Sequence, residues 1–165
     1  MQFHFLPAGN GQVERGRIAG MKISTKGRYA LRLMLDLAVY GGGSYIPLKV
    51  VSERQEISIK YLEQLITVLS RGGFVLSSRG AQGGYKLAKP AGQYTVGDIL
   101  RLMEGSLAPV TCLEQPENTC PRVEQCVTLA VWKQVQQAVE NVVDNITLAD
   151  LVEEYRAHAA PDYSI

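Results

Sequence analysis

The sequence predicts a mainly α-helical protein that carries one small β-hairpin. Apolar residues recur at helical spacing over residues 25–40 and 59–70, and a further helix is expected between them at residues 48–55. Directly afterwards, residues 74–77 and 85–87 flank a linker with three glycines, which is typical of a hairpin. Two helices joined by a tight turn and followed by a hairpin form a winged helix-turn-helix, so we expect this fold.

Start and stop signals mark each of the expected helices. Three consecutive glycines at 41–43 end the first helix, and Pro47 opens the second. Ser58 is a good N-cap for the third helix, which is the one expected to lie in the DNA major groove. Thr95, with Asp98 three residues later, resembles a capping box and begins a fourth helix.

One long helix, residues 127–145, is expected to dominate the C-terminal part. Its apolar residues are spaced three and four apart: Trp132, Val135, Val139, Val142 and Ile146. This spacing is an a/d stripe, which packs either on the same chain or on a second copy of the helix. A helix this long after a small DNA-binding unit favours the second copy, so we expect a homodimer. Thr147 and Asp150 cap a last short helix at residues 148–155.

Charge is divided unevenly along the chain. Residues 21–110 contain twelve Lys and Arg against six Asp and Glu, whereas residues 111–165 contain three against nine. A basic front half suits a polyanion such as double-stranded DNA, and an acidic back half does not. Such a split also arises by chance in surface composition, but here it coincides with the expected helix-turn-helix.

The residues expected to contact DNA come from three places in this fold. They are Ser58, Lys60, Tyr61 and Gln64 at the start of the third helix, Arg79 and Gly80 at the hairpin tip, and Lys26 and Arg28 on the first helix, with Lys49 and Lys86 as further phosphate clamps. Gln pairs with adenine and Lys reaches guanine, so the third helix has the chemistry of base recognition. For any single lysine the alternative is a solvated surface charge. For Arg79, beside glycine at a hairpin tip, we favour the contact with DNA.

Three segments of this sequence resemble the Rrf superfamily of bacterial transcription regulators, and in particular its IscR-like members. The segments are Met-Lys-Ile-Ser-Thr-Lys-Gly-Arg-Tyr-Ala from Met21, Tyr-Leu-Glu-Gln-Leu from Tyr61, and Arg-Gly-Ala-Gln-Gly-Gly-Tyr from Arg79. The resemblance extends from Met21 to about Tyr155. It implies a homodimer that binds palindromic promoter DNA. It also implies that residues 58, 60, 61 and 64 face the major groove and that Arg79 enters the minor groove.

Three cysteines fall within fifteen residues, at Cys112, Cys120 and Cys126. An odd number in a reducing compartment argues against a disulfide scaffold and for a metal, a redox function or packing. IscR-like members hold a 2Fe–2S cluster with three cysteines and one histidine, and the resemblance implies such a cluster here. The gap of five residues between Cys120 and Cys126 matches that pattern, whereas the first gap is two residues longer.

The fourth ligand of such a cluster is left open by the sequence. Leu129 stands where the histidine is expected, and Arg28 occupies the position from which other superfamily members supply a carboxylate. The nearby carboxylates are Glu114, Glu117 and Glu124. A thiol sensor without a cluster is the second interpretation of the loop, zinc is the third, and cysteines that merely pack are the fourth. The alternative function is a metal-free regulator of cysteine or sulfur metabolism with the same fold, controlled by thiol oxidation or by a partner protein.

These observations give the following organisation. We expect residues 1–20 to be a disordered extension, with Met21 as the native start, residues 21–105 to be the winged helix-turn-helix, and residues 106–126 to be the cysteine loop. Residues 127–155 form the dimerisation helix and the short last helix, and residues 156–165 form a tail. No segment has the character of a signal peptide or a membrane span, so we expect a cytoplasmic protein. With no Ser/His/Asp set, we do not expect an enzyme.

Overall fold

The structure is a computed structural model that describes residues 23–80 and 82–159. Its elements are α1 (Thr25–Gly41), α2 (Leu48–Gln55), α3 (Ile59–Arg71), β1 (Val75–Ser78), β2 (Gly84–Leu87), α4 (Val96–Glu104), α5 (Leu129–Val143) and α6 (Leu148–Ala159). Short 3-10 turns lie at Ala91–Gln93, Thr111–Leu113 and Val123–Gln125. The expected fold class is confirmed: helices with one antiparallel hairpin form a winged helix-turn-helix, followed by a long helix.

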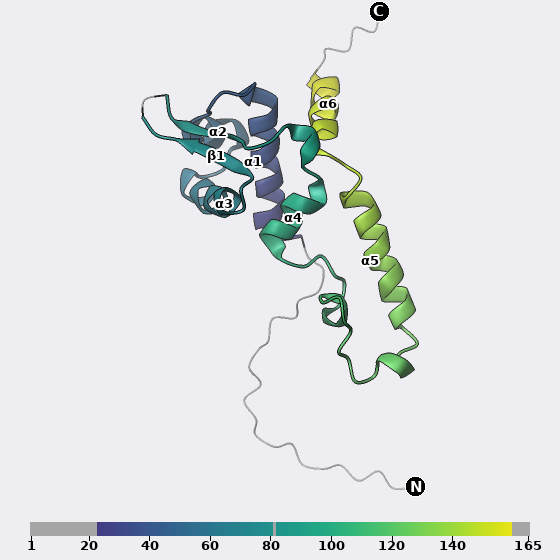
Figure 1. Ribbon diagram of the computed structural model, residues 1–165. Coiled ribbons are helices and arrows are strands. Elements are labelled where there is room, and N and C mark those ends of the chain that lie inside the picture. Colours follow the sequence, from purple (N-terminus) through teal and green to yellow (C-terminus); the bar gives the residue numbers. More distant parts are fainter. Residues whose placement is uncertain (1–22, 81, 160–165) are drawn as a thin grey trace, which may run out of the picture.

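Helix α1 is the centre of the fold. It contacts α2, α3 and β2 on one side and α4 and α6 on the other (Figure 1). Its inward side chains are fully buried, among them Leu33 and Met34, and they join one core with the inward face of α3. Burial of these apolar side chains stabilises the placement of α3 relative to α1, and it leaves the opposite face of α3 in solvent.

Side chains cap the helices at the positions that the sequence predicts. The Ser58 hydroxyl accepts a hydrogen bond from the Tyr61 backbone N–H, which begins α3. Thr95 and Asp98 form a reciprocal capping box at α4. The Asp150 carboxylate and the Thr147 hydroxyl make the corresponding bonds at the start of α6. Each of these bonds satisfies a backbone donor that has no partner within its helix.

The first strand of the hairpin is shifted by one residue from the expected 74–77 to Val75–Ser78, and the second strand begins one residue earlier than expected, at Gly84. Val75 pairs with Leu87 and Ser78 pairs with Gly84. Phe74 lies outside the strand because its N–H donates to the Leu69 carbonyl at 2.9 Å and so closes the turn after α3. Along its other edge, β2 is held by two hydrogen bonds of 2.9 Å between the backbones of Ile46 and Tyr85.

Helix α5 projects beside the winged helix-turn-helix, and the cysteine loop lies between it and α4 (Figure 1). It is shorter than the expected helix, since it ends where the Asn145 side chain caps the Asn141 carbonyl at 2.7 Å. Helix α6 is longer and continues to Ala159, into the residues expected to form a tail. Residues 1–20, and the tail beyond Ala159, lie outside the described residues. Among the described helices, none has the length and apolar character needed to cross a membrane.

Candidate DNA-binding surface and cysteine loop

The outward face of α3 presents polar side chains to solvent. Its inward residues Leu62, Leu65, Ile66 and Leu69 are buried. Lys60, Glu63 and Gln64 are exposed on the other face, and Ser58 stands exposed at its first turn. The Lys60 ammonium and the Gln64 amide are able to donate hydrogen bonds and the Glu63 carboxylate is able to accept them, so this face has the groups required for reading base edges. The start of α3 therefore places the expected residues on one accessible surface.

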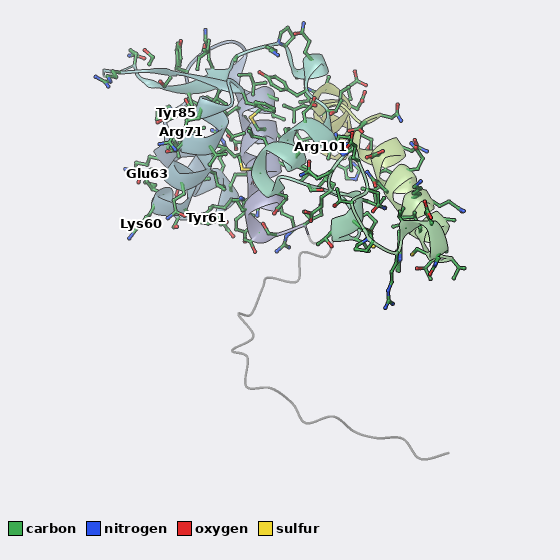
Figure 2. The ribbon with its side chains drawn as sticks, turned by 60° about the horizontal axis from the view of Figure 1, so that its bottom comes forward. Lys60, Tyr61, Glu63, Arg71, Tyr85 and Arg101 are labelled. Atoms are coloured by element: carbon green, nitrogen blue, oxygen red, sulfur yellow. The ribbon has the colours of Figure 1, made fainter. Side chains whose placement is uncertain are left out.

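Tyr61 is half-buried, whereas the sequence pattern indicated an exposed side chain. Its ring packs edge-on against the Tyr29 ring of α1, with 5.9 Å between the ring centroids. The contact fixes the ring in place. Figure 2 shows Tyr61 with Lys60, Glu63, Arg71 and Tyr85 along one side of the molecule, while Arg101 lies on another side. Tyr61 therefore lies at the margin of the surface, beside α1.

The wing places Arg79 at its tip, where the side chain is exposed. Gly80 follows with a φ of 101°, a conformation that favours glycine. Gly84 is required for a different reason: a Cβ there would lie 2.3 Å from the Ile46 carbonyl oxygen, which accepts a hydrogen bond from the neighbouring Tyr85 N–H. Glycine at these two positions lets the hairpin turn sharply and approach the α1–α2 connection closely.

The N-terminus of α1 carries Lys26 and Arg28, both exposed, and is fixed by a carboxylate from α4. The Glu104 Oε1 atom accepts hydrogen bonds from the Ser24 N–H at 3.0 Å, the Ser24 hydroxyl at 2.7 Å and the Gly27 N–H at 3.0 Å. A Cβ on Gly27 would lie 2.4 Å from that oxygen, so only glycine admits it. The sequence does not indicate this role of Glu104, because nothing local links it to a residue 77 positions earlier.

The two further lysines differ in their surroundings. Lys49 is exposed on α2. Lys86 is half-buried, and its ammonium group lies 4.6 Å from the centroid of the Tyr45 ring. This cation–π contact restrains the Lys86 side chain against Tyr45, whereas no such contact restrains a fully solvated lysine.

The cysteine loop, between α4 and α5, holds Cys112, Cys120 and Cys126 as free, half-buried thiols. Within residues 23–80 and 82–159, no three His, Cys, Asp or Glu side chains come close enough to hold a metal ion together. His158 lies on α6, 3.6 Å from Glu154, and His4 lies outside the described residues. The loop thus supplies three thiols on one short segment without gathering them into a ligand set.

Two features of the loop concern its polar chemistry. The pKa of the Cys126 thiol is lowered, first by a hydrogen bond with the Thr128 hydroxyl at 3.5 Å and further by backbone N–H groups at the start of α5. The Asn118 side chain accepts a hydrogen bond from the Cys120 N–H at 3.0 Å, while its own Nδ2 is buried without a partner among the described residues. An unpaired buried donor is unfavourable, so this loop has capacity for a further acceptor.

Helix α5 has no fully buried residue, although its apolar stripe is formed. A groove of about 480 Å³ is lined only by apolar side chains: Ile23, Leu100, Val135, Ala138, Val139, Val142 and Val143. Val142 is 57% exposed, which is unusual for a valine on the inner stripe of an amphipathic helix. The stripe is therefore covered in part by α4, and the remainder faces solvent.

Comparison with known proteins identifies the class to which this fold and surface belong. Residues 23–154 match the model of the Rrf2 family, which is described as an iron-dependent transcriptional regulator. The chain is 40% identical over 134 residues to Protein rrf2 of Nitratidesulfovibrio vulgaris, covering 81% of this chain and 89% of that protein. It is 40% identical over 132 residues to the HTH-type transcriptional regulator IscR of Cronobacter sakazakii, covering 80% of each.

Solved structures give the same result. The IscR of T. potens has a TM-score of 0.68 with 42% identity, covering 87% of this chain and 96% of that one. CymR, the global cysteine regulator of B. subtilis, has a TM-score of 0.67 with 38% identity, covering 81% of this chain and 97% of that one. The protein is thus a winged helix-turn-helix transcriptional regulator and not an enzyme. The chain belongs to the Rrf2 family.

Proposed function

We propose that this protein binds a palindromic promoter site as a homodimer. We further propose that it is a cytoplasmic protein and that it represses transcription from that promoter. The observation that carries the proposal is that α3 exposes its polar side chains and that the wing following it exposes an arginine at its tip. Ser58, Lys60, Tyr61 and Gln64 would read base edges in the major groove, and Arg79 with Gly80 would enter the minor groove. Lys26 and Arg28, whose helix end is fixed by Glu104, would hold phosphates.

The exposed apolar groove on α5 supports the dimer. Apolar side chains at a three-and-four spacing form the seam of paired helices, and a second copy of α5 would cover the valines that α4 leaves in solvent. A dimer would also present two copies of α3 to two half-sites with a fixed spacing, which accounts for a palindromic target.

For control of DNA binding, we propose a 2Fe–2S cluster held by Cys112, Cys120 and Cys126. The donor chemistry fits, since thiolates are the usual ligands of such clusters and Asn118 offers an unpaired buried N–H group. The thiols are not gathered in the described structure, so binding would require the loop to close around the group. When bound, the cluster would supply sensitivity to iron and oxidants. The fourth ligand would be one of the loop carboxylates or a group from the second subunit.

A metal-free regulator of cysteine or sulfur metabolism is the second candidate. The ungathered thiols and the lowered pKa of Cys126 favour it, because a thiolate is the form that oxidants attack. The similarity to CymR, at 38% identity and a TM-score of 0.67, is close to that to IscR, at 42% and 0.68, and does not decide between the two functions. Under this proposal, oxidation of Cys126 or the binding of a partner protein would alter DNA binding.

One experiment separates the two proposals. The protein would be produced and purified anaerobically, its absorption spectrum and its iron and sulfide content measured, and its affinity titrated against a duplex selected from a random-sequence pool. A coloured protein with two irons per chain, whose affinity changes on removal of the cluster, supports the cluster. A colourless protein whose affinity changes on thiol oxidation supports the metal-free regulator. Failure to select any duplex contradicts the DNA-binding surface itself.

A further inference from the structure

One face of α1 carries a continuous line of polar and aromatic side chains between α6 and the recognition helix α3. The line consists of Tyr29, Arg32, Asp36 and Tyr40, spaced three, four and four residues apart, so that they lie above one another along the helix. Neither the core packing nor the expected DNA contacts require polar groups there. Each of the four side chains contacts a neighbouring helix, α2, α3 or α6, through a hydrogen bond or an aromatic contact.

At the α6 end, the Tyr155 hydroxyl is hydrogen-bonded to the Tyr40 hydroxyl, and the two rings meet edge-on with centroids 6.1 Å apart. The Tyr40 ring in turn lies under the Arg54 guanidinium of α2, whose central carbon is 4.2 Å from the ring centroid. Helix α6 therefore reaches α2 through Tyr40.

In the middle, the Asp36 carboxylate is buried, the only charged side chain so classified within the described ranges. It accepts hydrogen bonds from Arg54 at 3.0 and 2.5 Å and from the Gln55 amide at 2.9 Å. A buried carboxylate is strongly unfavourable unless it is paired in this way, so Asp36 fixes both side chains at the end of α2. Arg54 contributes the planar, bidentate geometry that lysine lacks.

At the α3 end, Arg32 donates to the side chain of Gln55 at 3.1 Å and to its backbone carbonyl at 2.7 Å. The guanidinium also lies 5.3 Å from the Tyr29 ring centroid, and Tyr29 packs against Tyr61 of α3. Gln55 ends α2 and is followed by Glu56, whose φ of 54° is the only positive value at a non-glycine residue among those described. One further residue, Ile57, separates Glu56 from Ser58, the N-cap of α3.

We propose that this line is a brace by which α6 positions the recognition helix for sequence reading. Asp36 and Arg32 hold the last residue of α2 through three bonds, which fixes the point from which the tight turn enters α3. Tyr155 completes the line from outside the helix-turn-helix. Its residues are positioning residues, because their contacts are with α2, α3 and α6, so that they would influence DNA only through the placement of α3. The inference rests on the proposed DNA-binding surface.

The brace predicts a particular kind of defect. Contacts to base edges depend on the placement of α3 more strictly than contacts to phosphates, which Lys26 and Arg28 make from α1. Weakening the brace should therefore lower the affinity for a selected duplex and leave the affinity for a scrambled duplex almost unchanged. A purely structural role would lower thermal stability without changing the ratio of the two affinities.

The test measures that ratio for Tyr155→Phe and Arg54→Lys at one salt concentration and at a temperature where both variants are folded. The probes are a duplex selected with the wild-type protein and its scrambled counterpart. Tyr155→Phe removes one hydroxyl hydrogen bond, so the ratio should fall about threefold. Arg54→Lys removes the bidentate pairing with Asp36, so the ratio should fall about tenfold.

Ala157→Ser, exposed on the same helix, is the matched control and should keep the wild-type ratio. The brace is refuted if both test variants keep the wild-type ratio, whatever their melting temperatures. It is also refuted if the selected and scrambled duplexes lose affinity equally. If the wild-type protein selects no duplex at all, the proposed function fails, and this outcome is distinct from a failure of the brace.

Discussion

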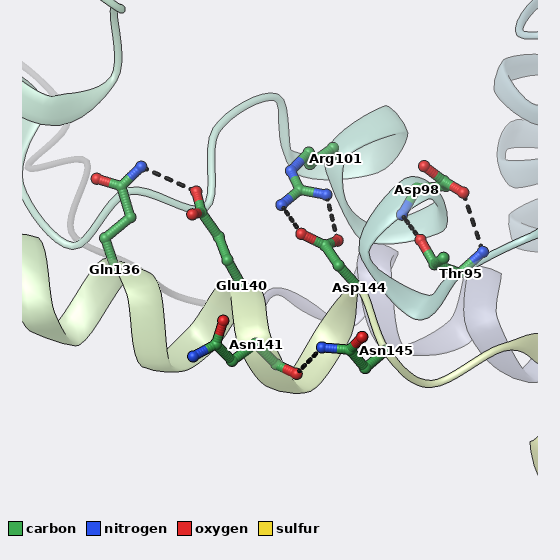
Figure 3. A network of polar contacts seen from close by, with 8 residues as sticks. All are labelled: Thr95, Asp98, Arg101, Gln136, Glu140, Asn141, Asp144 and Asn145. Carbon is green, nitrogen blue, oxygen red and sulfur yellow. Dashed lines mark hydrogen bonds and ion pairs between the residues drawn. The ribbon is translucent and has the colours of Figure 1, made fainter.

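Arg101 of α4 is paired with Asp144, the residue that ends α5, through two hydrogen bonds of 2.6 and 2.8 Å (Figure 3). The pairing is bidentate, which is the strongest arrangement open to an arginine and a carboxylate. Gly97 makes room for it, since a Cβ there would lie within 1.9 Å of the Asp144 carboxylate. This pair attaches the long helix to the DNA-binding unit at one point, close to where α6 begins.

Asp144→Asn should lower stability at neutral pH and leave it unchanged in acid. The Arg101 guanidinium lowers the pKa of Asp144 below its ordinary value of 3.8, so the pair stabilises the folded state fully above that value. The stabilisation is lost as the pH falls through the lowered pKa. Both side chains are more than a third exposed, which limits the effect to about 0.5–1 kcal/mol.

Urea unfolding at pH 7 and at a series of pH values that fall below 3.8 provides the measurement for this pair. Asp150→Asn is a poor control because Asp150 caps α6, whereas Glu153→Gln on the exposed face of the same helix is suitable. A destabilisation of Asp144→Asn that does not diminish at any pH down this series would show that the charge of Asp144 is not responsible.

Gly97→Ala should displace the Arg101–Asp144 pair and loosen α5 from α4. The added methyl group would also lie 2.7 Å from an Arg101 Nη atom. Both exposed side chains can move aside, so the cost is the loss of the pair, about 0.5–1 kcal/mol. Gly92→Ala is the matched control, because its methyl group would meet only the Ala149 Cβ, at 3.8 Å. Thermal unfolding checks the result: equal melting temperatures for the two variants would contradict this account of Gly97.

The sequence predicted those parts of the fold that depend on local chemistry. Ser58, Thr95 and Thr147 cap helices as their spacing indicated, because a capping bond joins residues two or three apart. Glu104 was not predicted, since it reaches α1 across 77 residues and only the folded chain brings the two together. Asp36 was missed as well, although a charged residue among the buried positions of α1 is a signal that sequence reasoning can use.

Arg79→Ala should weaken binding to a selected duplex by about 1–3 kcal/mol, the usual range for an arginine that reads a groove. Lys26→Ala should instead weaken all duplexes alike and reduce the salt dependence by about one unit of slope, since it removes one phosphate contact. Titrations at several salt concentrations distinguish the two. Lys133→Ala removes the same charge from α5, away from this surface, and should bind like the wild type. Unchanged affinity of Arg79→Ala would refute the wing assignment.

Val139→Asp should produce monomers that bind the selected duplex weakly. The substitution places a carboxylate in the apolar groove on α5, where a partner helix would have to bury it. Gln134→Asp adds the same charge at an exposed position outside the groove and should leave the dimer intact. Sedimentation at micromolar concentration measures both. A monomeric wild-type protein in that experiment would contradict the dimer.

Cys112→Ala, Cys120→Ala and Cys126→Ala should each abolish the visible absorption of anaerobically purified protein while leaving a folded dimer. The three thiols lie on one loop outside the core, so removing any one of them disturbs ligation and not packing. Thr119→Ala, exposed in the same loop, is the control and should retain the colour.

Leu129 stands where a histidine is expected as the fourth ligand. One carboxylate of the loop should therefore prove as necessary for the cluster as the thiols. Glu114→Gln, Glu117→Gln and Glu124→Gln test this requirement in turn. If all three keep the colour in a dimer, the fourth ligand comes from elsewhere; if the wild type is colourless and iron-free yet binds its duplex, the metal-free regulator replaces the cluster.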